Sequence, residues 1–126
     1  MFTISRKIEI DAGHRVPYHH SKCRYLHGHR WTIVAHVSSH LLVKADPDHS
    51  DSGMVVDFGY IKQVLTERIH DQFDHRMILW ERDPLVQIET RPESWGFMES
   101  LKAARILEST RTVPCIPTAE GLAEHW

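Results

Sequence analysis

Two segments of alternating polar and apolar residues constrain the fold of this chain more than any other feature. Residues 2–11 and 30–40 both alternate with a period of two, which is typical of a β-strand with one buried face. Their apolar faces consist of Phe2, Ile4, Ile8 and Ile10, and of Trp31, Ile33, Ala35 and Val37. Because no helical crossover separates the segments, we expect antiparallel pairing. The sequence therefore predicts an N-terminal β-hairpin.

Length and charge exclude several classes of function. The chain has 126 residues, which fit a single domain over 1–126, and a formal net charge of −2 at pH 7. So balanced a charge does not favour binding to nucleic acid or to an anionic membrane. No apolar run approaches the roughly 20 residues of a membrane span, and the N-terminus lacks the pattern of a secretory signal. We expect a cytoplasmic protein.

Three helices are predicted in the remainder of the chain. The first covers 57–70, with Asp57 as its N-cap. The second covers 94–108 with Ser94 as its N-cap, in a proline-punctuated stretch whose chemistry the sequence does not reveal. The third is short and begins after Thr118, its predicted cap. The first helix should turn a stripe of apolar residues toward the sheet: Ile61, Val64, Leu65 and Ile69.

Histidine is unusually frequent, with eleven residues where roughly two or three are expected for this length. His27 and His29, just before the second strand, are two residues apart, so both imidazoles can point to the same side. His14, at the end of the first strand, lies beside them if the hairpin forms. Three imidazoles with an open fourth position describe a catalytic zinc site. A surface role for the pair and a backbone-bonded loop role for His14 remain open.

Cys23 precedes His27 by four residues and lies between Lys22 and Arg24, two basic residues that favour a thiolate. It can serve as a fourth metal ligand, as a nucleophile or as a base. A small buried hydrophobic role is the alternative. The second cysteine, Cys115, is predicted to be structural, and two cysteines so far apart indicate no disulfide framework.

The dipeptide Asp74-His75 follows the first predicted helix. A carboxylate that orients an imidazole makes the histidine an effective proton donor and acceptor. The alternative is a histidine at a helix C-terminus beside a solvated aspartate. The other histidines are predicted to lie on the surface or in loops: His19, His20, His36, His40, His49, His70 and His125.

Five motifs occur in a fixed order along the chain. They are Ala12-Gly13-His14-Arg15, Cys23-x-x-x-His27-Gly28-His29, Gly53-Met54-Val55-Val56-Asp57-Phe58, Phe73-Asp74-His75 and Pro117-Thr118-Ala119-Glu120. In this order they resemble the 6-pyruvoyl-tetrahydropterin synthase family, over the chain from Phe2 to Trp126. The cysteine spacing resembles the 6-carboxy-5,6,7,8-tetrahydropterin synthase branch, which serves 7-deazaguanine and queuosine biosynthesis. Residues 79–113 are longer and more divergent than the family's usual connection.

The resemblance implies an enzyme that converts 7,8-dihydroneopterin triphosphate to 6-carboxytetrahydropterin and releases triphosphate and acetaldehyde. It implies Zn²⁺ held by His14, His27 and His29, with the zinc as a Lewis acid. It further implies Cys23 as the base that abstracts a carbon-bound proton, His75 as a proton relay oriented by Asp74, and Thr118 in the pterin pocket. Four basic residues are candidates to attract the triphosphate, or are only solubilising: Arg15, Lys22, Arg24 and Arg30.

The same resemblance implies the α+β tunnelling fold, an antiparallel four-stranded sheet with two helices on one face. Its subunits assemble sheet edge to sheet edge into a barrel, as a homo-oligomer with three or six copies. Family members continue past the last helix into two further strands, which carry the glutamate that grips the pterin ring. We therefore expect this chain to lack its C-terminal strands. A 6-pyruvoyl-tetrahydropterin synthase and a non-catalytic zinc-binding member remain the alternatives.

Overall fold

The structure is a computed structural model, and it describes residues 1–87, 99–102, 105 and 107–126. Ser94, the predicted cap of a helix over 94–108, lies outside the described residues. Within that range, residues 99–102 are helical, and η5 (Leu107–Ser109) is a single 3₁₀ turn. None of the helices described is long and apolar enough to cross a membrane.

The predicted hairpin is confirmed. β1 (Phe2–His14) and β2 (His27–Ser39) pair antiparallel along their whole length, with Phe2 opposite Ser39 and His14 opposite His27. Both strands extend beyond the predicted ends, since β1 continues to His14 and β2 already begins at His27. The His-Gly-His segment is therefore part of the ladder, and the strand register determines where its side chains point.

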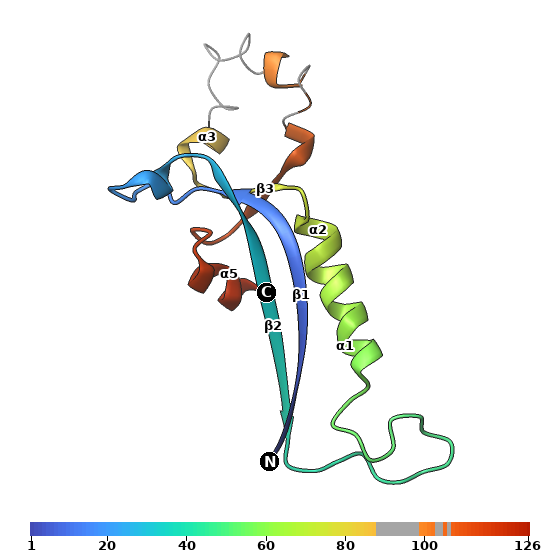
Figure 1. Ribbon diagram of the computed structural model, residues 1–126. Coiled ribbons are helices and arrows are strands. Elements are labelled where there is room, and N and C mark those ends of the chain that lie inside the picture. Colours follow the sequence, from blue (N-terminus) through green and yellow to red (C-terminus); the bar gives the residue numbers. More distant parts are fainter. Residues whose placement is uncertain (88–98, 103–104, 106) are drawn as a thin grey trace.

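The sheet is mixed, so the expectation of an antiparallel four-stranded sheet is wrong. Its strand order is β2-β1-β3-β4, where β3 (Met77–Trp80) runs parallel to β1 and β4 (Thr110–Val113) runs parallel to β3. The helix after β2 returns the chain to the end of the sheet where β1 finishes, and β3 then continues in the direction of β1 (Figure 1). β3 and β4 are separated by 29 residues in the sequence, which is long enough for the crossover that a parallel pair requires.

Asp57 caps the first helical segment, as predicted: its side chain accepts a hydrogen bond from the backbone N–H of Gly59. The segment runs without interruption through α1 (Phe58–Leu65), a π-helical turn η2 (Thr66–His70) and α2 (Asp71–Phe73). It ends three residues beyond the predicted boundary. Its buried residues are Ile61, Leu65, Ile69 and Phe73, while Val64 lies off this face and is 38% exposed.

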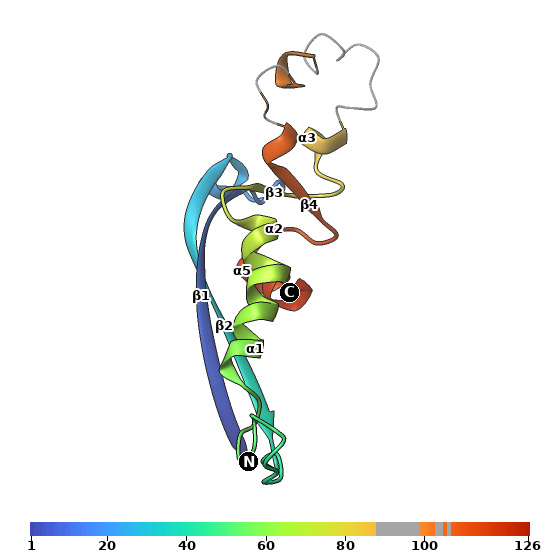
Figure 2. The same cartoon turned by 90° about the vertical axis from the view of Figure 1, so that its right-hand side faces the viewer.

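The short terminal helix α5 (Ala119–His125) lies on the same face of the sheet as α1 and α2 (Figure 2). Its Leu122 is fully buried, and the ring of Trp126 contacts that of Phe73 at a centroid distance of 5.4 Å. These helices enclose the core together with four residues of the sheet, Ile10, Ala12, Ile78 and Val113. Two helical segments of the described residues, α1–α2 and α5, thus lie on one face of the sheet.

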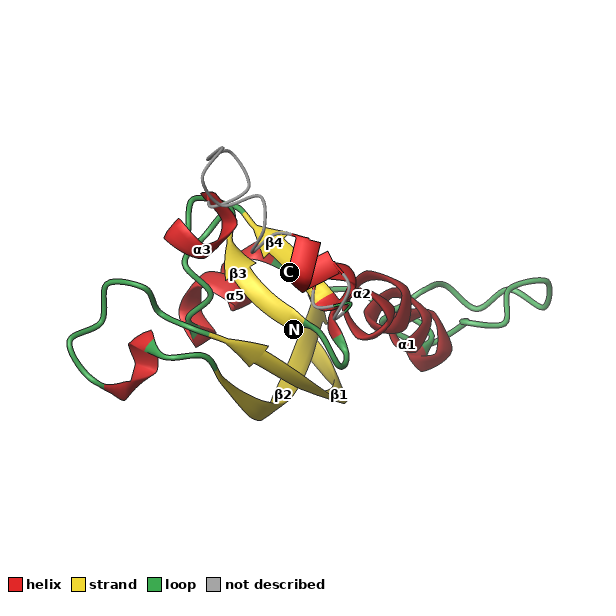
Figure 3. Cartoon of the chain, turned by 90° about the horizontal axis from the view of Figure 1, so that it is seen from above, coloured by secondary structure: helices red, strands yellow, loops and turns green. Residues whose placement is uncertain are grey.

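Two connecting loops extend to opposite sides of the sheet (Figure 3). The loop between β1 and β2 carries the 3₁₀ turn η1 (Lys22–Arg24), and the other loop covers residues 40–57. Arg15, directly after β1, forms a bidentate ion pair with the fully buried Asp83, which follows β3. The N···O distances are 2.7 and 2.6 Å. This pair anchors the end of β1 to the turn that precedes α3 (Pro84–Gln87).

Candidate active site

Three histidines meet where the hairpin strands β1 and β2 come together at the β1 C-terminus. His14 faces His27 directly across the ladder, and His29 lies two residues further along the same side of β2. Their ring centroids are separated by 4.5, 5.1 and 4.8 Å. One ring nitrogen from each lies within 4.8 Å of the other two, and this is the only such potential ligand group among the described residues. The structure therefore brings together the three histidines predicted from the sequence.

Hydrogen bonds orient two of these rings. Nδ1 of His14 donates to the carbonyl of Pro117 at 2.6 Å, and Nδ1 of His27 donates to the carbonyl of Tyr25 at 2.7 Å. A carbonyl only accepts, so each Nδ1 carries a proton, and in the neutral imidazole Nε2 keeps its lone pair. His14 is 6% exposed, and its Nε2 is buried without a partner. Such an atom is unfavourable in a protein interior unless something binds to it.

The donor set fits a metal ion. Burial, as the largest cause, lowers the pKa of His14, and the neighbouring His27 and His29 lower it further, against the opposing effect of the Pro117 carbonyl. The neutral imidazole is the form that binds metal. Nitrogens on a tetrahedral ion with bonds of about 2.1 Å are about 3.4 Å apart, which the 4.8 Å limit permits. His29 is exposed, so the group is open on one side.

Trp31 forms one wall of this site, and the sequence analysis did not single it out for that role. Its ring stands edge-on to His14 at 4.8 Å and to His29 at 5.7 Å, and its indole N–H donates to the carbonyl of Ala12 at 3.1 Å. The period of two places Trp31 on the same face as His29, so this signal was available. The Pro117 carbonyl carried no such signal, because any residue has a backbone carbonyl.

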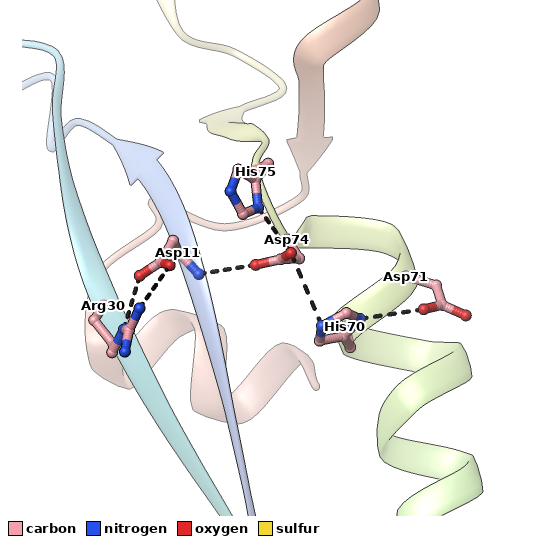
Figure 4. A network of polar contacts seen from close by, with 6 residues as sticks. All are labelled: Asp11, Arg30, His70, Asp71, Asp74 and His75. Atoms are coloured by element: carbon pink, nitrogen blue, oxygen red, sulfur yellow. Dashed lines mark hydrogen bonds and ion pairs between the residues drawn. The ribbon is translucent and has the colours of Figure 1, made fainter.

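Asp74 and His75 form a hydrogen-bonded pair at the start of the segment that leads into β3 (Figure 4). Nδ1 of His75 lies 2.8 Å from Oδ2 of Asp74, while Oδ1 of Asp74 accepts the backbone N–H of Asp11 at 2.9 Å. That N–H, followed by the His75 hydrogen bond, lowers the pKa of Asp74. The ionised carboxylate therefore holds one ring nitrogen of His75 and leaves Nε2 free.

The backbone of His75 has an unusual conformation. Its φ of 56° lies in the left-handed region, which non-glycine residues seldom adopt and which is often found at functional sites. The backbone N–H of His75 donates to the carbonyl of Asp11 at 2.7 Å, which secures this conformation against the edge of β1 that also pairs with β3. The His75 side chain is 79% exposed and available to another molecule.

His75 and one of the three histidines, His29, border the same shallow hollow of about 500 Å³. Its floor is residues 11–13 and 28–30, and neither His14 nor His27 lines it. The exposed ion pair between Asp11 and Arg30 borders the same hollow. Alternation places those two side chains on the face of the hairpin opposite to that of His14.

Cys23 lies on the exposed loop between the strands, within η1, and it is not part of the metal-ligand group. The structure does not place it as a fourth ligand, and its role as a base stays a prediction. Two of the four basic candidates for binding triphosphate are already paired with carboxylates, Arg15 with Asp83 and Arg30 with Asp11.

Thr118 caps α5, as predicted for its local role, because its hydroxyl accepts the backbone N–H of Gly121 at 3.0 Å. It is half-buried and directly follows Pro117, which contacts His14. Its proposed contact with a pterin stays a prediction. Cys115 is half-buried nearby, its Sγ 3.4 Å from the carbonyl of Gly121, and burial raises the pKa of its thiol.

Comparison with known proteins places these features in a family. A family model described as "6-pyruvoyl tetrahydropterin synthase" matches residues 3–126. The chain is 40% identical to the 6-carboxy-5,6,7,8-tetrahydropterin synthase of Rickettsia bellii over 125 residues, which are 99% of this chain and 77% of the relative. The corresponding protein of Rickettsia felis is 34% identical with the same coverage.

A solved structure shows the same fold. The crystal structure of an uncharacterized protein from Wolinella succinogenes superposes with a TM-score of 0.74, covering 98% of this chain and 79% of that one, at 24% sequence identity. The family match extends over nearly all residues of the chain, and these two Rickettsia proteins are 40% and 34% identical over almost the same span. This chain therefore belongs to the 6-pyruvoyl tetrahydropterin synthase family.

Proposed function

We propose that this protein is a zinc-dependent 6-carboxy-5,6,7,8-tetrahydropterin synthase, which converts 7,8-dihydroneopterin triphosphate to 6-carboxytetrahydropterin with release of triphosphate and acetaldehyde. The observation that carries the proposal is the convergence of His14, His27 and His29, with the unpartnered buried Nε2 of His14 among them. The names of the relatives support the carboxy branch of the family. Its product would enter 7-deazaguanine biosynthesis.

Each group of side chains has a separate role in the proposed reaction. His14, His27 and His29 would hold Zn²⁺ as neutral imidazoles, with the two Nδ1 hydrogen bonds keeping Nε2 directed inward. When bound, the metal supplies a Lewis acid that stabilises negative charge on a substrate oxygen. His75, held by Asp74 through Nδ1, would accept or donate a proton at Nε2. Cys23 would remove the carbon-bound proton.

Within one chain, Asp74 and His75 bond the backbone of Asp11 at the edge of β1, and the hollow that His75 borders is not lined by His14 or His27. We infer that one chain does not complete the site. We propose a homo-oligomer of three or six chains with the tunnelling fold, in which a neighbouring copy supplies the missing part of each site. The outer strands of the described sheet, β2 and β4, each leave one edge without a partner strand. Exposed edges of this kind favour pairing with another chain.

The test is to incubate the zinc-loaded protein with 7,8-dihydroneopterin triphosphate and to determine the product by mass spectrometry. We expect 6-carboxytetrahydropterin together with stoichiometric acetaldehyde. A 6-pyruvoyl product without acetaldehyde would transfer the chain to the other branch of the family. Absence of turnover by zinc-loaded, assembled protein would contradict the enzymatic proposal and leave a zinc-binding role.

A further inference from the structure

We propose that the turn formed by Pro117 and Thr118 is a positioning element of the metal centre. Thr118 would hold the Pro117 carbonyl against His14 and thereby increase the affinity of the site for metal. This inference rests on the proposed role of His14 as a metal ligand. It assigns to Thr118 a function distinct from contact with a pterin.

The contact between the turn and the ligand is short and buried. Pro117 is almost fully buried, and its carbonyl lies 2.6 Å from Nδ1 of His14, although 103 positions separate the two residues in sequence. Water cannot readily replace a carbonyl in such surroundings. If the carbonyl moved away, Nδ1 of His14 would lose its acceptor, and the proton would no longer be confined to Nδ1. Removing a partner of this kind typically weakens metal binding by about 10- to 100-fold.

Thr118 determines where this carbonyl points. Its backbone N–H donates to the carbonyl of Ile116 at 2.8 Å, which makes Pro117 the central residue of a tight turn. The pyrrolidine ring restricts φ of Pro117. On the other side, the Thr118 hydroxyl accepts from Gly121, and the Thr118 carbonyl accepts from the fully buried Leu122 at 3.0 Å. The turn is therefore joined to the core through the first turn of α5.

A helix cap can also serve stability alone, and the chain offers a matched control for that alternative. Asp57 caps α1 by the same kind of hydrogen bond, from the backbone N–H of Gly59. The hydrogen bonds that orient His14 and His27 are made by Pro117 and Tyr25, so neither depends on the α1 cap. If a cap acts only through stability, both caps should affect metal binding equally. If Thr118 positions His14, replacing Thr118 should weaken zinc binding and replacing Asp57 should not.

The experiment measures zinc affinity by competition with a chromophoric chelator, for the full chain and three variants. Thr118→Val should raise the zinc dissociation constant about 10- to 100-fold. Thr118→Ser keeps the hydroxyl and Asp57→Ala leaves the turn intact, so both should bind zinc within about twofold of the wild type. If Thr118→Val does not fold, Thr118→Gly removes the hydroxyl at a smaller loss of helix stability, and the same order is expected.

A second readout follows His14 in the metal-free protein. Nitrogen NMR should show the proton confined to Nδ1 of His14 in the wild type and in Asp57→Ala, and a mixture of both tautomers in Thr118→Val. Wild-type affinity in both Thr118→Val and Thr118→Gly would overturn this inference alone. Equal weakening in Asp57→Ala would also overturn it. Absence of zinc binding by the wild type would instead contradict the proposed metal site itself.

Discussion

The hairpin and the segment that follows α2 differ in how they contribute to the site. The hairpin places three side chains together through a continuous ladder between β1 and β2. The later segment contributes two strands of four residues each, a single proline carbonyl and a histidine with positive φ. Potential metal ligands thus come from regular local structure, whereas the carbonyl that orients His14, and the proposed proton relay, depend on contacts between distant parts of the chain.

The largest expected effect comes from removing a ligand on the hairpin. His29→Ala should lose most of the bound zinc and essentially all turnover, because two imidazoles cannot provide the usual three protein ligands of a catalytic site. Metal analysis of the purified variant measures this. His36→Ala is the matched control, since His36 is an exposed β2 residue whose Nδ1 lies 2.9 Å from the hydroxyl of Ser5. Unchanged zinc content in His29→Ala would reject the assignment.

Cys23→Ala tests whether the loop between β1 and β2 contributes to catalysis without contributing to zinc binding. We expect this variant to keep its zinc and to lose about 10²- to 10⁴-fold in turnover, the usual contribution of one acid or base group. Zinc content and steady-state rate are measured on the same preparation. If Cys23→Ala loses zinc as completely as His29→Ala, then Cys23 is a ligand and the loop closes over the metal.

His75→Ala tests the later segment in the same way. Turnover should fall by about 10²- to 10⁴-fold without loss of zinc. Asp74 acts through His75, so replacing both residues should reduce turnover little more than replacing His75 alone, because groups that work as a unit are not additive. Rates are normalised to folded, zinc-loaded protein. Losses that multiply in the double variant would contradict the coupled pair.

Arg15→Leu probes stability at the junction of the two regions. It leaves the fully buried Asp83 carboxylate without its bidentate partner, and breaking a buried pair in this way typically destabilises a protein by about 3–5 kcal/mol. Urea unfolding of the zinc-free protein measures the effect. Arg30→Leu breaks the exposed pair with Asp11 and should have a much smaller effect. Equal losses from the two variants would show that burial of the pair does not matter.

The smallest expected effect is a dependence of stability on pH. The pKa of Asp74 is lowered in the folded chain, chiefly by the Asp11 N–H, so its stabilising contribution is present above the ordinary aspartate pKa of 3.8 and disappears as the pH falls through the lower pKa of the folded chain. Asp74→Asn should remove this part of the acid dependence. The free energy of unfolding of the wild type and of Asp74→Asn is measured between pH 5 and 3. The same dependence on pH in both proteins would contradict this role of Asp74.

Much of the site was predictable because it depends on local periodicity. A strict period of two determines which side chains share a face, so the hairpin follows from the pattern, and the meeting of His14 with His27 and His29 was predicted on condition that the hairpin forms. The caps at Asp57 and Thr118 are equally local, since each side chain bonds a backbone N–H within three residues. Such features depend on neighbouring residues in the sequence, and the sequence therefore determined them.

Tertiary structure decided the rest. Strands of four residues such as β3 and β4 are too short to show a period, so neither the strands nor their parallel direction was visible. The Pro117 carbonyl and the Asp11 N–H are backbone groups, which leave no trace in residue identity. The position of His75 relative to the three histidines depends on how the chain returns to the edge of β1. Only folding, which joins segments about 60 and 100 residues apart, places these groups where they act.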